Sequence, residues 1–310
     1  MIKITYFTPT YNRKQLLGNL YESLKKQTNK EFIWLIIDDG SSDGTDKAVG
    51  EWIKENQLTI KYIYKENGGK NTALDMAHEI CETEYISCID SDDYLSDDST
   101  EVLYKYFNRT SEDEKLAGIV ARRAHYDGTP FNESWSKVPE KICFYDLPKK
   151  YGYTQDTTLI FKTEVVKNYK FPKFEEERFV TESVLYNQFL HDYDLLMIPE
   201  CIYLAEYQDN GYTSQGLNLF YKNPNGYLYS LKQEVYYAIK NKQNFKTIVA
   251  KSAVFHAWKK ALKLKEKYKN DNKFGFLYNF LGWLFKYKFA SEYSNGYKNY
   301  IKDNQKNDRQ

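Results

Sequence analysis

Four consecutive polar residues, Asp90-Ser91-Asp92-Asp93, form the strongest chemical signal in the sequence. They directly follow a short apolar run at residues 85–89 that predicts a buried strand. Carboxylates two residues apart at a strand end can converge on one hard divalent cation, and Mg²⁺ and Mn²⁺ prefer such oxygen ligands and often share them with substrate phosphates. The alternative is a turn without a ligand, because aspartate is common in turns. We favour a metal site formed by Asp90 and Asp92.

A second acidic pair, Asp38-Asp39, follows the continuous apolar run FIWLII at residues 32–37. The glycines behind it, Gly40 and Gly44, indicate a tight turn that leads into a helix N-cap. One carboxylate is enough for such a turn, so the other is predicted to face a ligand. A carboxylate in that place can accept a hydrogen bond from the N3–H of uracil or from a ribose hydroxyl.

A third candidate loop, Asn67–Thr72, contains Gly68, Gly69 and Lys70. Glycines let the backbone approach a ligand closely, and a lysine can offset the charge of a metal-bound diphosphate. The alternative is an ordinary turn with a solvated lysine. We favour a ligand-binding loop.

The first 110 residues predict the elements that must position these clusters. Short apolar runs typical of strands alternate there with segments in which apolar residues have helical spacing. Apolar runs predict strands at 2–7, 32–37, 58–64 and 85–89, and helical spacing predicts helices after Asn12 and at 45–54, 71–81 and 97–107. We expect Pro9 to end the first strand and Asn12 to cap the first helix. The order predicts an α/β fold with a mostly parallel, doubly wound sheet. Ligands of such sheets bind beyond the carboxyl ends of the strands, where these clusters and Thr8–Asn12 fall.

The pattern is looser beyond residue 115. It predicts strands at 118–124 and 157–162, a helix at 179–190, and a strand pair at 195–205 that Pro199 interrupts. The polar segment Asp209–Ser214 is either a lid over the ligand or an ordinary connection. Lys-rich helices follow from Tyr227, and the polar tail from about Asn295 is expected to fray. We predict two domains, a ligand-binding domain at 1–225 and a basic, aromatic-rich helical region at 226–310.

The net charge of +1 hides an uneven distribution. Residues 226–310 contain 18 Lys and Arg against 6 Asp and Glu, a net +12, whereas residues 1–225 contain 26 against 37, a net −11. Within the basic part, the segment FGFLYNFLGWLFKYKF at 274–289 is apolar nearly all round but too short to span a bilayer. It suits a helix on an anionic membrane surface, and equally a helix buried among its neighbours or in a homo-oligomer contact. Nucleic-acid binding is not expected, because no nucleic-acid motif accompanies the charge.

Several other classes of protein are not expected. The start MIKITYFTPTYN lacks the basic and apolar regions of a secretory signal. There is no run of 18 apolar residues, so no ordinary membrane span is expected. The four cysteines and four histidines have no metal-ligand or redox spacing. A cytoplasmic setting fits these features, with peripheral binding at the inner face of the cell membrane left open by the basic part.

Four motifs in a fixed order resemble glycosyltransferase family 2, which has the GT-A fold: TPTYNR at 8–13, IIDDGSSDGT at 36–45, NGGKNTALDMA at 67–77 and IDSDD at 89–93. The resemblance is close to about residue 110 and looser to about residue 210. It implies an inverting transferase that uses a nucleotide-sugar donor, commonly a UDP-sugar, with Mn²⁺ or Mg²⁺ as cofactor. The Gln-x-x-Arg-Trp signature of processive synthases in the family is not visible, which favours the addition of single sugars.

The resemblance also implies roles for individual residues. Asp39 is expected to contact the base, Asp90 to lie near the ribose or the metal, and Asp92 to ligate the metal. Asp93 and Asp156 are candidates for contact with the sugar or the acceptor. The full predicted nucleotide-binding set is Pro9, Tyr11, Asp39, Lys70, Asp90 and Ser91.

Inversion requires a base on the face of the sugar opposite the leaving group, where it takes the proton of the acceptor hydroxyl. The family places this base in a Glu-Asp pair at the start of a helix, and Thr181-Glu182 stands in that place here, so the pair itself is absent. Glu182 is the predicted base, because Tyr186 follows it at the expected four-residue spacing. The alternative is a first-turn acid that the helix dipole favours.

The predicted function is metal-dependent transfer of a sugar from a UDP-sugar to a hydroxyl of a lipid-linked or polymeric glycan acceptor, in bacterial cell-surface polysaccharide, teichoic acid or glycolipid synthesis. One alternative is a catalytically silent GT-A domain that acts as a binding or scaffold partner. Four intact residues argue against it: Asp39, Asp90, Asp92 and Glu182. Another is a sugar nucleotidyltransferase, which would need a Gly-rich, basic loop where Thr8–Arg13 stands.

Overall fold

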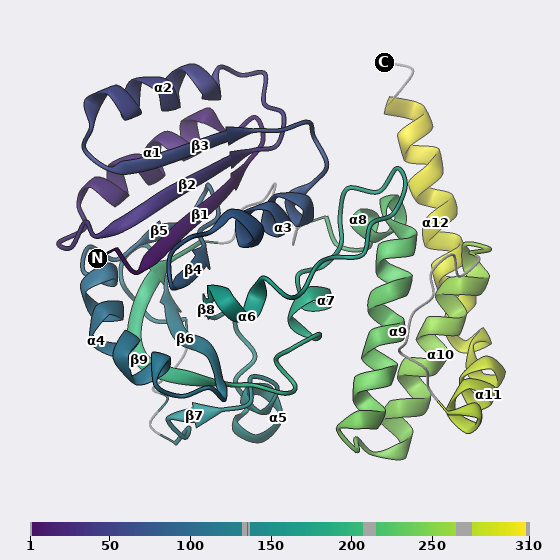
Figure 1. The fold of residues 1–310 in the computed structure, drawn as a ribbon. Coiled ribbons are helices and arrows are strands. Elements are labelled where there is room, and N and C mark those ends of the chain that lie inside the picture. Colours follow the sequence, from purple (N-terminus) through teal and green to yellow (C-terminus); the bar gives the residue numbers. More distant parts are fainter. Residues whose placement is uncertain (1, 132–134, 136, 207–214, 265–274, 308–310) are drawn as a thin grey trace. The chain divides into compact units, whose positions relative to one another are not determined.

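The computed structural model describes residues 2–131, 135, 137–206, 215–264 and 275–307. They form two compact units (Figure 1). The first unit comprises Met1–Lys170 and Gln188–Tyr207, and the second comprises Phe171–Asn187 and Gln208–Gln310. The predicted lid, Asp209–Ser214, lies outside the described residues.

The first unit is built on one mixed sheet with the strand order β3, β2, β1, β4, β8, β6, β9, β5, and with β7 paired to β9. β1 (Ile4–Thr10), β2 (Phe32–Asp38), β3 (Thr59–Tyr64) and β4 (Tyr85–Cys88) run parallel. β8 (Thr158–Lys162) is antiparallel to β4 and to β6 (Leu116–Ala124), while β9 (Asp194–Leu204) is parallel to β6. The short strands β5 (Tyr94–Leu95) and β7 (Lys141–Ile142) are antiparallel to β9. The predicted parallel α/β core is thus confirmed for β1 to β4, and the pairing becomes mixed beyond them.

Helices cover both faces of the parallel strands. α1 (Lys14–Lys25), α2 (Thr45–Glu55) and α3 (Lys70–Ile80) join these strands, α4 (Ser99–Ser111) follows β5, and α5 (Asp146–Tyr151) and α6 (Thr163–Val166) are short. Tyr6 and Trp34 belong to a core that includes residues of α1, α2 and α4, among them Leu20, Tyr21, Val49, Leu103 and Phe107. The next residue of β1, Phe7, points to the opposite face and contacts His78 of α3. Burial on both faces explains why FIWLII is continuously apolar.

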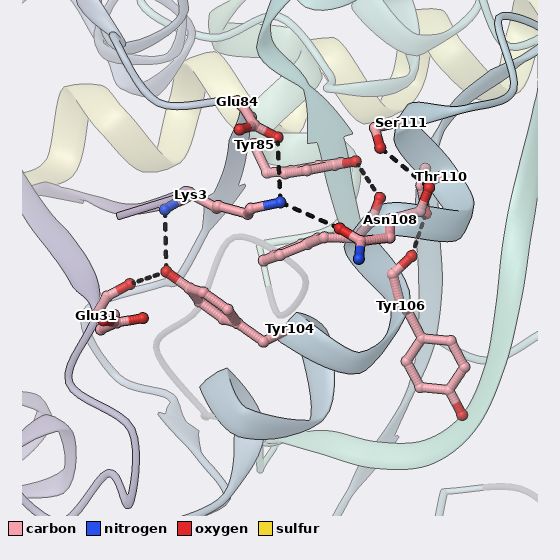
Figure 2. A network of polar contacts seen from close by, with 10 residues as sticks. Lys3, Glu31, Glu84, Tyr85, Tyr104, Tyr106, Asn108, Thr110 and Ser111 are labelled. Atoms are coloured by element: carbon pink, nitrogen blue, oxygen red, sulfur yellow. Dashed lines mark hydrogen bonds and ion pairs between the residues drawn. The ribbon is translucent and has the colours of Figure 1, made fainter. Parts of the chain in front are cut away.

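A network of polar contacts fastens the amino ends of β1 and β4 to α4 (Figure 2). The backbone N–H of Lys3 donates to the Tyr104 hydroxyl (3.0 Å), and this hydroxyl donates to the carbonyl oxygen of Glu31 (2.8 Å). Lys3 Nζ donates to Asn108 Oδ1 (3.3 Å), and the Tyr85 hydroxyl donates to a carbonyl oxygen of α4 (2.9 Å). Side chains far apart in the sequence therefore hold this end of the sheet together.

Two strands continue through prolines at which we expected a break. Pro9 lies inside β1 opposite Ile37, and its missing N–H costs little because the pairing of β1 with β4 ends at Phe7. Pro199 lies inside β9 where the register with β6 shifts between Val120 and Arg122. A β-bulge leaves a residue unpaired, so a proline is tolerated there.

Two predicted helix boundaries were also wrong. Asn12 does not cap α1, which begins at Lys14; it adopts a left-handed φ of 51°, and its side chain bonds a neighbouring loop instead. The predicted helix at 179–190 is the single turn α7 (Ser183–Tyr186). The residues before that turn are tied elsewhere, since Asn223 Oδ1 accepts the N–H groups of Arg178 and Phe179 at 3.0 and 3.1 Å.

The second unit is helical. With α7 it contains α8 (Leu217–Lys222), α9 (Pro224–Lys240), α10 (Phe245–Ala261), α11 (Phe276–Phe285) and α12 (Tyr287–Asn307). α10 packs against α9, α11 and α12 around a core of Tyr221, Leu228, Leu231, Val235, Ile248, Phe255 and Trp258. The predicted fraying from Asn295 was wrong, because α12 continues to Asn307 and its Tyr297 and Tyr300 rings pack on Tyr221. None of the helices within the described ranges combines the length and the apolar character needed to cross a bilayer.

Candidate functional site

The candidate site lies where the strand order of the sheet reverses. From β1 the chain proceeds outward to β2 and β3, and it then returns to place β4 on the other side of β1. Ligands of parallel α/β sheets bind at such a reversal, beyond the carboxyl ends of the strands. The structure places all four predicted clusters at the carboxyl ends of β1 to β4: Thr8–Asn12, Asp38–Ser42, Asn67–Lys70 and Asp90–Asp93.

The two adjacent carboxylates at the end of β2 have different surroundings. Asp38 is fully buried and accepts hydrogen bonds from the Ser41 N–H (2.7 Å) and the Tyr62 hydroxyl (2.8 Å), so it shapes the turn. Asp39 accepts the N–H groups of Gly68 (2.9 Å) and Gly69 (2.8 Å) and pairs with Lys65 Nζ. The turn-shaping role predicted for one of the pair thus falls to Asp38, and Asp39 fixes the glycine loop after β3. Contact of Asp39 with a ligand stays a prediction.

The loops after β1 and β2 are tied to each other. The Asn12 N–H donates to Ser41 Oγ, and the Ser42 N–H donates to Asn12 Oδ1, both at 2.8 Å. The N–H of Lys14, the first residue of α1, donates to Asp43 Oδ2 (2.9 Å). These bonds hold the chain that presents Tyr11, whose side chain is 49% exposed just beyond β1. Its ring is thus accessible to a planar ligand.

Both carboxylates of the predicted metal site are paired with cations from other loops. Lys70 Nζ lies 2.6 Å from Asp90 Oδ1, and Arg13 lies 3.1 Å from Asp92 Oδ2. The same Arg13 nitrogen donates to Ser91 Oγ (3.4 Å), so three of the predicted residues meet two cations here. Burial opposes ionisation of Asp90, but the charges of Lys70, Arg123 and Arg13 together outweigh it and hold the pKa of Asp90 below its usual value.

Asp93 belongs to a buried network behind these pairs. The Tyr203 hydroxyl donates to Asp93 Oδ2 (2.8 Å) and accepts from the backbone N–H of Asp90 (3.1 Å). Burial and the nearby charge of Asp90 raise the pKa of Asp93 to about 7. Asp93 is therefore held behind the site, where its hydrogen bond to Tyr203 supports the backbone that carries Asp90.

Arg123, near the carboxyl end of β6, is a cation that the predicted set of site residues does not include. Its guanidinium lies 4.3 Å from the centroid of the Tyr203 ring, and its Nε donates to the carbonyl oxygen of Thr157 (3.1 Å). Burial opposes its charge, but Tyr203, Asp93, Asp90 and Asp156 together raise the pKa of Arg123. The exposed Asp156 and the carboxylates after β4 thus act on one fixed cation. The sequence signal was an arginine pair at the end of a strand, of which alternation sends only one to this face.

The carboxylate ligands at the predicted metal site suit a hard divalent cation, but they are few. Asp90 and Asp92 offer the carboxylate oxygens that Mg²⁺ and Mn²⁺ prefer. Across the described ranges, no group of three or more His, Cys, Asp or Glu side chains gathers around one point. The residues therefore fit a cation that takes most of its ligands from a diphosphate and water, which is the usual habit of Mg²⁺.

The predicted base, Glu182, lies in the second unit, at the N-cap of α7. Its Oε2 accepts the Tyr186 hydroxyl at 3.0 Å, so the four-residue spacing seen in the sequence is a direct contact. The turn is anchored by Asn187, which donates to Gln233 Oε1 (3.0 Å), while Gln233 donates to the carbonyl oxygen of Val184 (3.0 Å). Glu182 is thus held on a fixed turn.

A sheet that reverses beside β1 and carries carboxylates and lysines at its carboxyl edge is the framework of a nucleotide-dependent α/β enzyme. The sequence model of glycosyl transferase family 2 matches residues 5–170, more than half of the chain, and the chain belongs to this family. The match extends beyond the four motifs, through β8.

Curated relatives include three bacterial proteins. An uncharacterised glycosyltransferase of Mycoplasma genitalium is 28% identical over 191 residues, which is 56% of this chain and 59% of that protein. The poly(ribitol-phosphate) beta-N-acetylglucosaminyltransferase TarS of Staphylococcus aureus is 26% identical over 54% of this chain and 29% of its own length. The teichoic acid poly(glycerol phosphate) polymerase of Staphylococcus epidermidis is 33% identical over 36% and 15%. The chain therefore spans less than two thirds of each of these relatives.

Solved structures with a similar fold include TarS of S. aureus, residues 1–349, in complex with UDP-GlcNAc. It is 17% identical with a TM-score of 0.62, and the match covers 96% of this chain and 92% of that one. A mannosyltransferase of Pyrobaculum calidifontis in complex with GDP-Man and Mn²⁺ has a TM-score of 0.50 at 17% identity, over 84% and 72%. These matches confirm the predicted GT-A fold with a helical C-terminal region.

Proposed function

We propose that the protein is an inverting, non-processive glycosyltransferase that moves one sugar from a UDP-sugar to an acceptor hydroxyl during synthesis of a bacterial cell-surface polysaccharide, teichoic acid or glycolipid. The observation that carries this proposal is the meeting of Asp39, Lys70, Asp90 and Asp92 where the sheet reverses. Relatives named for teichoic acid synthesis and a similar fold solved with UDP-GlcNAc support the donor and the polymer class.

In the proposed mechanism the three loops bind the nucleotide. Asp39 contacts the base, Pro9 and Tyr11 line it, and Lys70 stabilises the diphosphate as Asp90 and Ser91 hold the ribose side. A bound Mg²⁺ or Mn²⁺ on Asp92 and Asp90 would offset negative charge on the leaving diphosphate. The acceptor oxygen bonds to the anomeric carbon as the bond from that carbon to the diphosphate oxygen breaks.

The proton of the acceptor hydroxyl goes to Glu182 in this mechanism. The hydrogen bond from Tyr186 orients the Glu182 carboxylate. Asp156 is the proposed contact on the sugar or acceptor side. Asp93, which the sequence also offered for such a contact, is instead proposed to support the site through its hydrogen bond with the buried Tyr203. Direct displacement inverts the configuration at the anomeric carbon.

A thermal-shift screen with UDP-, GDP-, CDP- and TDP-sugars, each with and without Mn²⁺, tests the donor. A ligand that binds only the folded state raises the melting temperature in proportion to its occupancy. We expect the largest shift with a UDP-sugar and Mn²⁺, and no shift with any nucleotide would refute the proposal. Binding without turnover of any acceptor would favour a silent binding domain. Release of pyrophosphate from a nucleoside triphosphate and a sugar 1-phosphate, assayed separately, would favour a nucleotidyltransferase.

Substitution of the proposed base separates binding from chemistry. Glu182→Gln should keep the donor-induced thermal shift but lose transfer by roughly 100-fold or more, the scale of general base catalysis. Glu175→Gln is the matched control, because Glu175 is an exposed acid seven residues earlier in the same unit. Full activity of Glu182→Gln would remove Glu182 from this role.

A further inference from the structure

α11 is attached to its neighbour through its least apolar side. Ser252 of α10 donates to the carbonyl oxygen of Tyr278 (2.9 Å), and His256 Nε2 lies 2.8 Å from Asn279 Oδ1. Gly282 is buried, and a Cβ at this position would collide with the side chain and backbone of Ser252. The α10 and α11 backbones are therefore as close as only a glycine permits. Polar bonds, a small residue and the partly buried Tyr278 ring hold α11 in place.

The opposite side of α11 is apolar and faces outward. Its residues recur at three- and four-residue intervals along one stripe of the helix. Phe276 is 83% exposed and Trp283 is 51% exposed, and the rings stack in a row, with centroids 6.0 Å apart for Phe276 and Phe280 and 6.4 Å apart for Phe280 and Trp283. We call this stripe the apolar face of α11: Phe276, Leu277, Phe280, Trp283 and Leu284.

This orientation reverses the normal arrangement of a helix on a folded unit. A surface helix ordinarily turns its apolar stripe inward, because removal of apolar surface from water drives folding. A contiguous exposed stripe of large apolar side chains marks an interaction surface. The apolar face of α11 is therefore a surface that a partner covers.

Lysines border the apolar face and identify the partner by charge. The exposed Lys260 has its Nζ 3.5 Å from the ring centroid of Tyr287, whereas Lys286 is buried and donates to the carbonyl oxygen of Trp283 at 2.8 Å. Lys288 is exposed one residue beyond Tyr287, and residues 226–310 carry a net +12. A second copy of the chain would bring these cations against each other. Anionic lipid instead pairs with the cations and receives the rings at the acyl boundary.

We propose that α11 lies in the interface of a bilayer that contains anionic lipid, with its apolar face at the acyl boundary and the exposed Lys260 and Lys288 at the headgroups. Burial of a stripe of aromatic and leucine side chains together with several lysines is the combination that holds monotopic helices on membranes. This proposal stands on α11 and its neighbours alone and does not depend on glycosyl transfer.

Flotation of the full chain with phosphatidylcholine vesicles, with and without phosphatidylglycerol, tests the proposal. We expect binding to the phosphatidylglycerol vesicles that weakens as salt is raised. The double variant Phe280→Ser/Trp283→Ser should lose about tenfold or more in partition, since both side chains are exposed and only the bilayer would bury them. The control Ile53→Ser/Leu217→Ser removes two similarly exposed apolar side chains outside α11 and should float like the wild type.

Two further measurements separate the possible partners. Lys260→Gln/Lys288→Gln should weaken binding to anionic vesicles several-fold and leave the weaker binding to phosphatidylcholine unchanged. Trp283 is the one exposed residue among the five tryptophans, all of which the structure describes, so a vesicle-induced blue shift of fluorescence should vanish in Trp283→Phe.

Three outcomes would overturn the proposal: no flotation of the wild type, flotation that Phe280→Ser/Trp283→Ser leaves intact, or a lipid-independent dimer in sedimentation that the same variant dissolves. The last outcome would assign the apolar face to a second copy. The donor-induced thermal shift of the variant should equal that of the wild type, so a failure here is distinct from a failure of the proposed transfer reaction.

Discussion

The two ends of the parallel strands use polar side chains in different ways. At the amino end, most contacts join hydroxyl, amide and backbone groups, as in the contacts of Tyr104 with Lys3 and Glu31 (Figure 2). The ion pair of Lys3 with Glu84 at this end is long, at 3.9 Å. At the carboxyl end the contacts join full charges from separate loops, as in the pairs Lys70–Asp90 and Arg13–Asp92. A charged ligand can replace one partner of an ion pair at the carboxyl end, but it cannot replace the neutral hydrogen bonds at the amino end. The comparison separates the end that fastens the fold from the end that binds.

Loss of the Asp92 carboxylate should give the largest effect on function. Asp92→Asn keeps the size of the side chain but removes the charge that would hold the cation, so we expect a loss of transfer of roughly 100-fold or more. The melting temperature without ligand should stay close to that of the wild type, because the Arg13–Asp92 pair is partly exposed. Activity assays and thermal unfolding check both parts. Asp97→Asn, an exposed acid after β5, is the matched control.

The buried His78 should make the stability of the first unit sensitive to acid. It is buried on α3, Nδ1 has no hydrogen-bond partner, and burial lowers its pKa to about 4 from 6.5. The unfolded chain takes up a proton near pH 6.5 and the folded chain does not, so stability is full above that pH and falls as pH drops toward 4. The loss is up to roughly 3 kcal/mol.

Urea unfolding at pH 7 and near pH 4.5 measures this loss. His78→Leu should flatten the pH dependence and leave donor binding at pH 7 unchanged. An equally steep acid loss in the variant would contradict this role for His78.

Substitution of Arg123 tests whether the candidate site at the carboxyl ends of the strands extends beyond the predicted loops. Arg123→Gln removes the cation that faces Asp93 and Asp90, and we expect kcat/KM for the donor to fall about tenfold, the scale of one lost charge contact in a partly buried site. Arg122→Gln is the control, because Arg122 bonds the carbonyl oxygen of Pro199 on the other side of β6. Equal effects of the two substitutions would remove Arg123 from the site.

Tyr104→Phe should have the smallest effect, confined to stability. The change deletes the hydrogen bonds of the Tyr104 hydroxyl with Lys3 and Glu31, and we expect a loss of about 1–2 kcal/mol in the free energy of unfolding. Transfer at saturating substrate should not change. A loss of transfer comparable to that of Asp92→Asn would erase the distinction between the two ends.

The sequence predicted the elements whose signals are local. FIWLII and the short apolar runs around it located β1 to β4, and turn residues located the loops that follow them. It failed where long-range pairing overrides local preference. Pro9 stays in β1 because β4 has already ended, Pro199 stays in β9 at a bulge, and Asn12 bonds a loop thirty residues away instead of capping α1.

The sequence indicated which residue types gather at the candidate site, but it did not indicate which of their side chains contact one another. The spacing of Asp90 and Asp92 pointed to their loop, yet nothing in the sequence assigns Lys70 to one and Arg13 to the other. Arg123 and Tyr203 come from strands far along the chain, so only the pairing of β6 with β9 reveals their contact. The ligand-binding and catalytic roles of all the predicted site residues stay predictions until ligands are measured.

The pairing of Asp39 has a consequence for the thermodynamics of ligand binding. Lys65 and two glycine N–H groups already bond this carboxylate. In the same way, Lys70 and Arg13 pair with Asp90 and Asp92 after β4. In the proposed mechanism the donor therefore enters by exchange, because bonds within the resting protein break as bonds to the nucleotide form. Calorimetry should therefore record a modest heat for a sizeable affinity. Chelation should leave the loops folded, because the protein's own cations balance their charge while the donor is away.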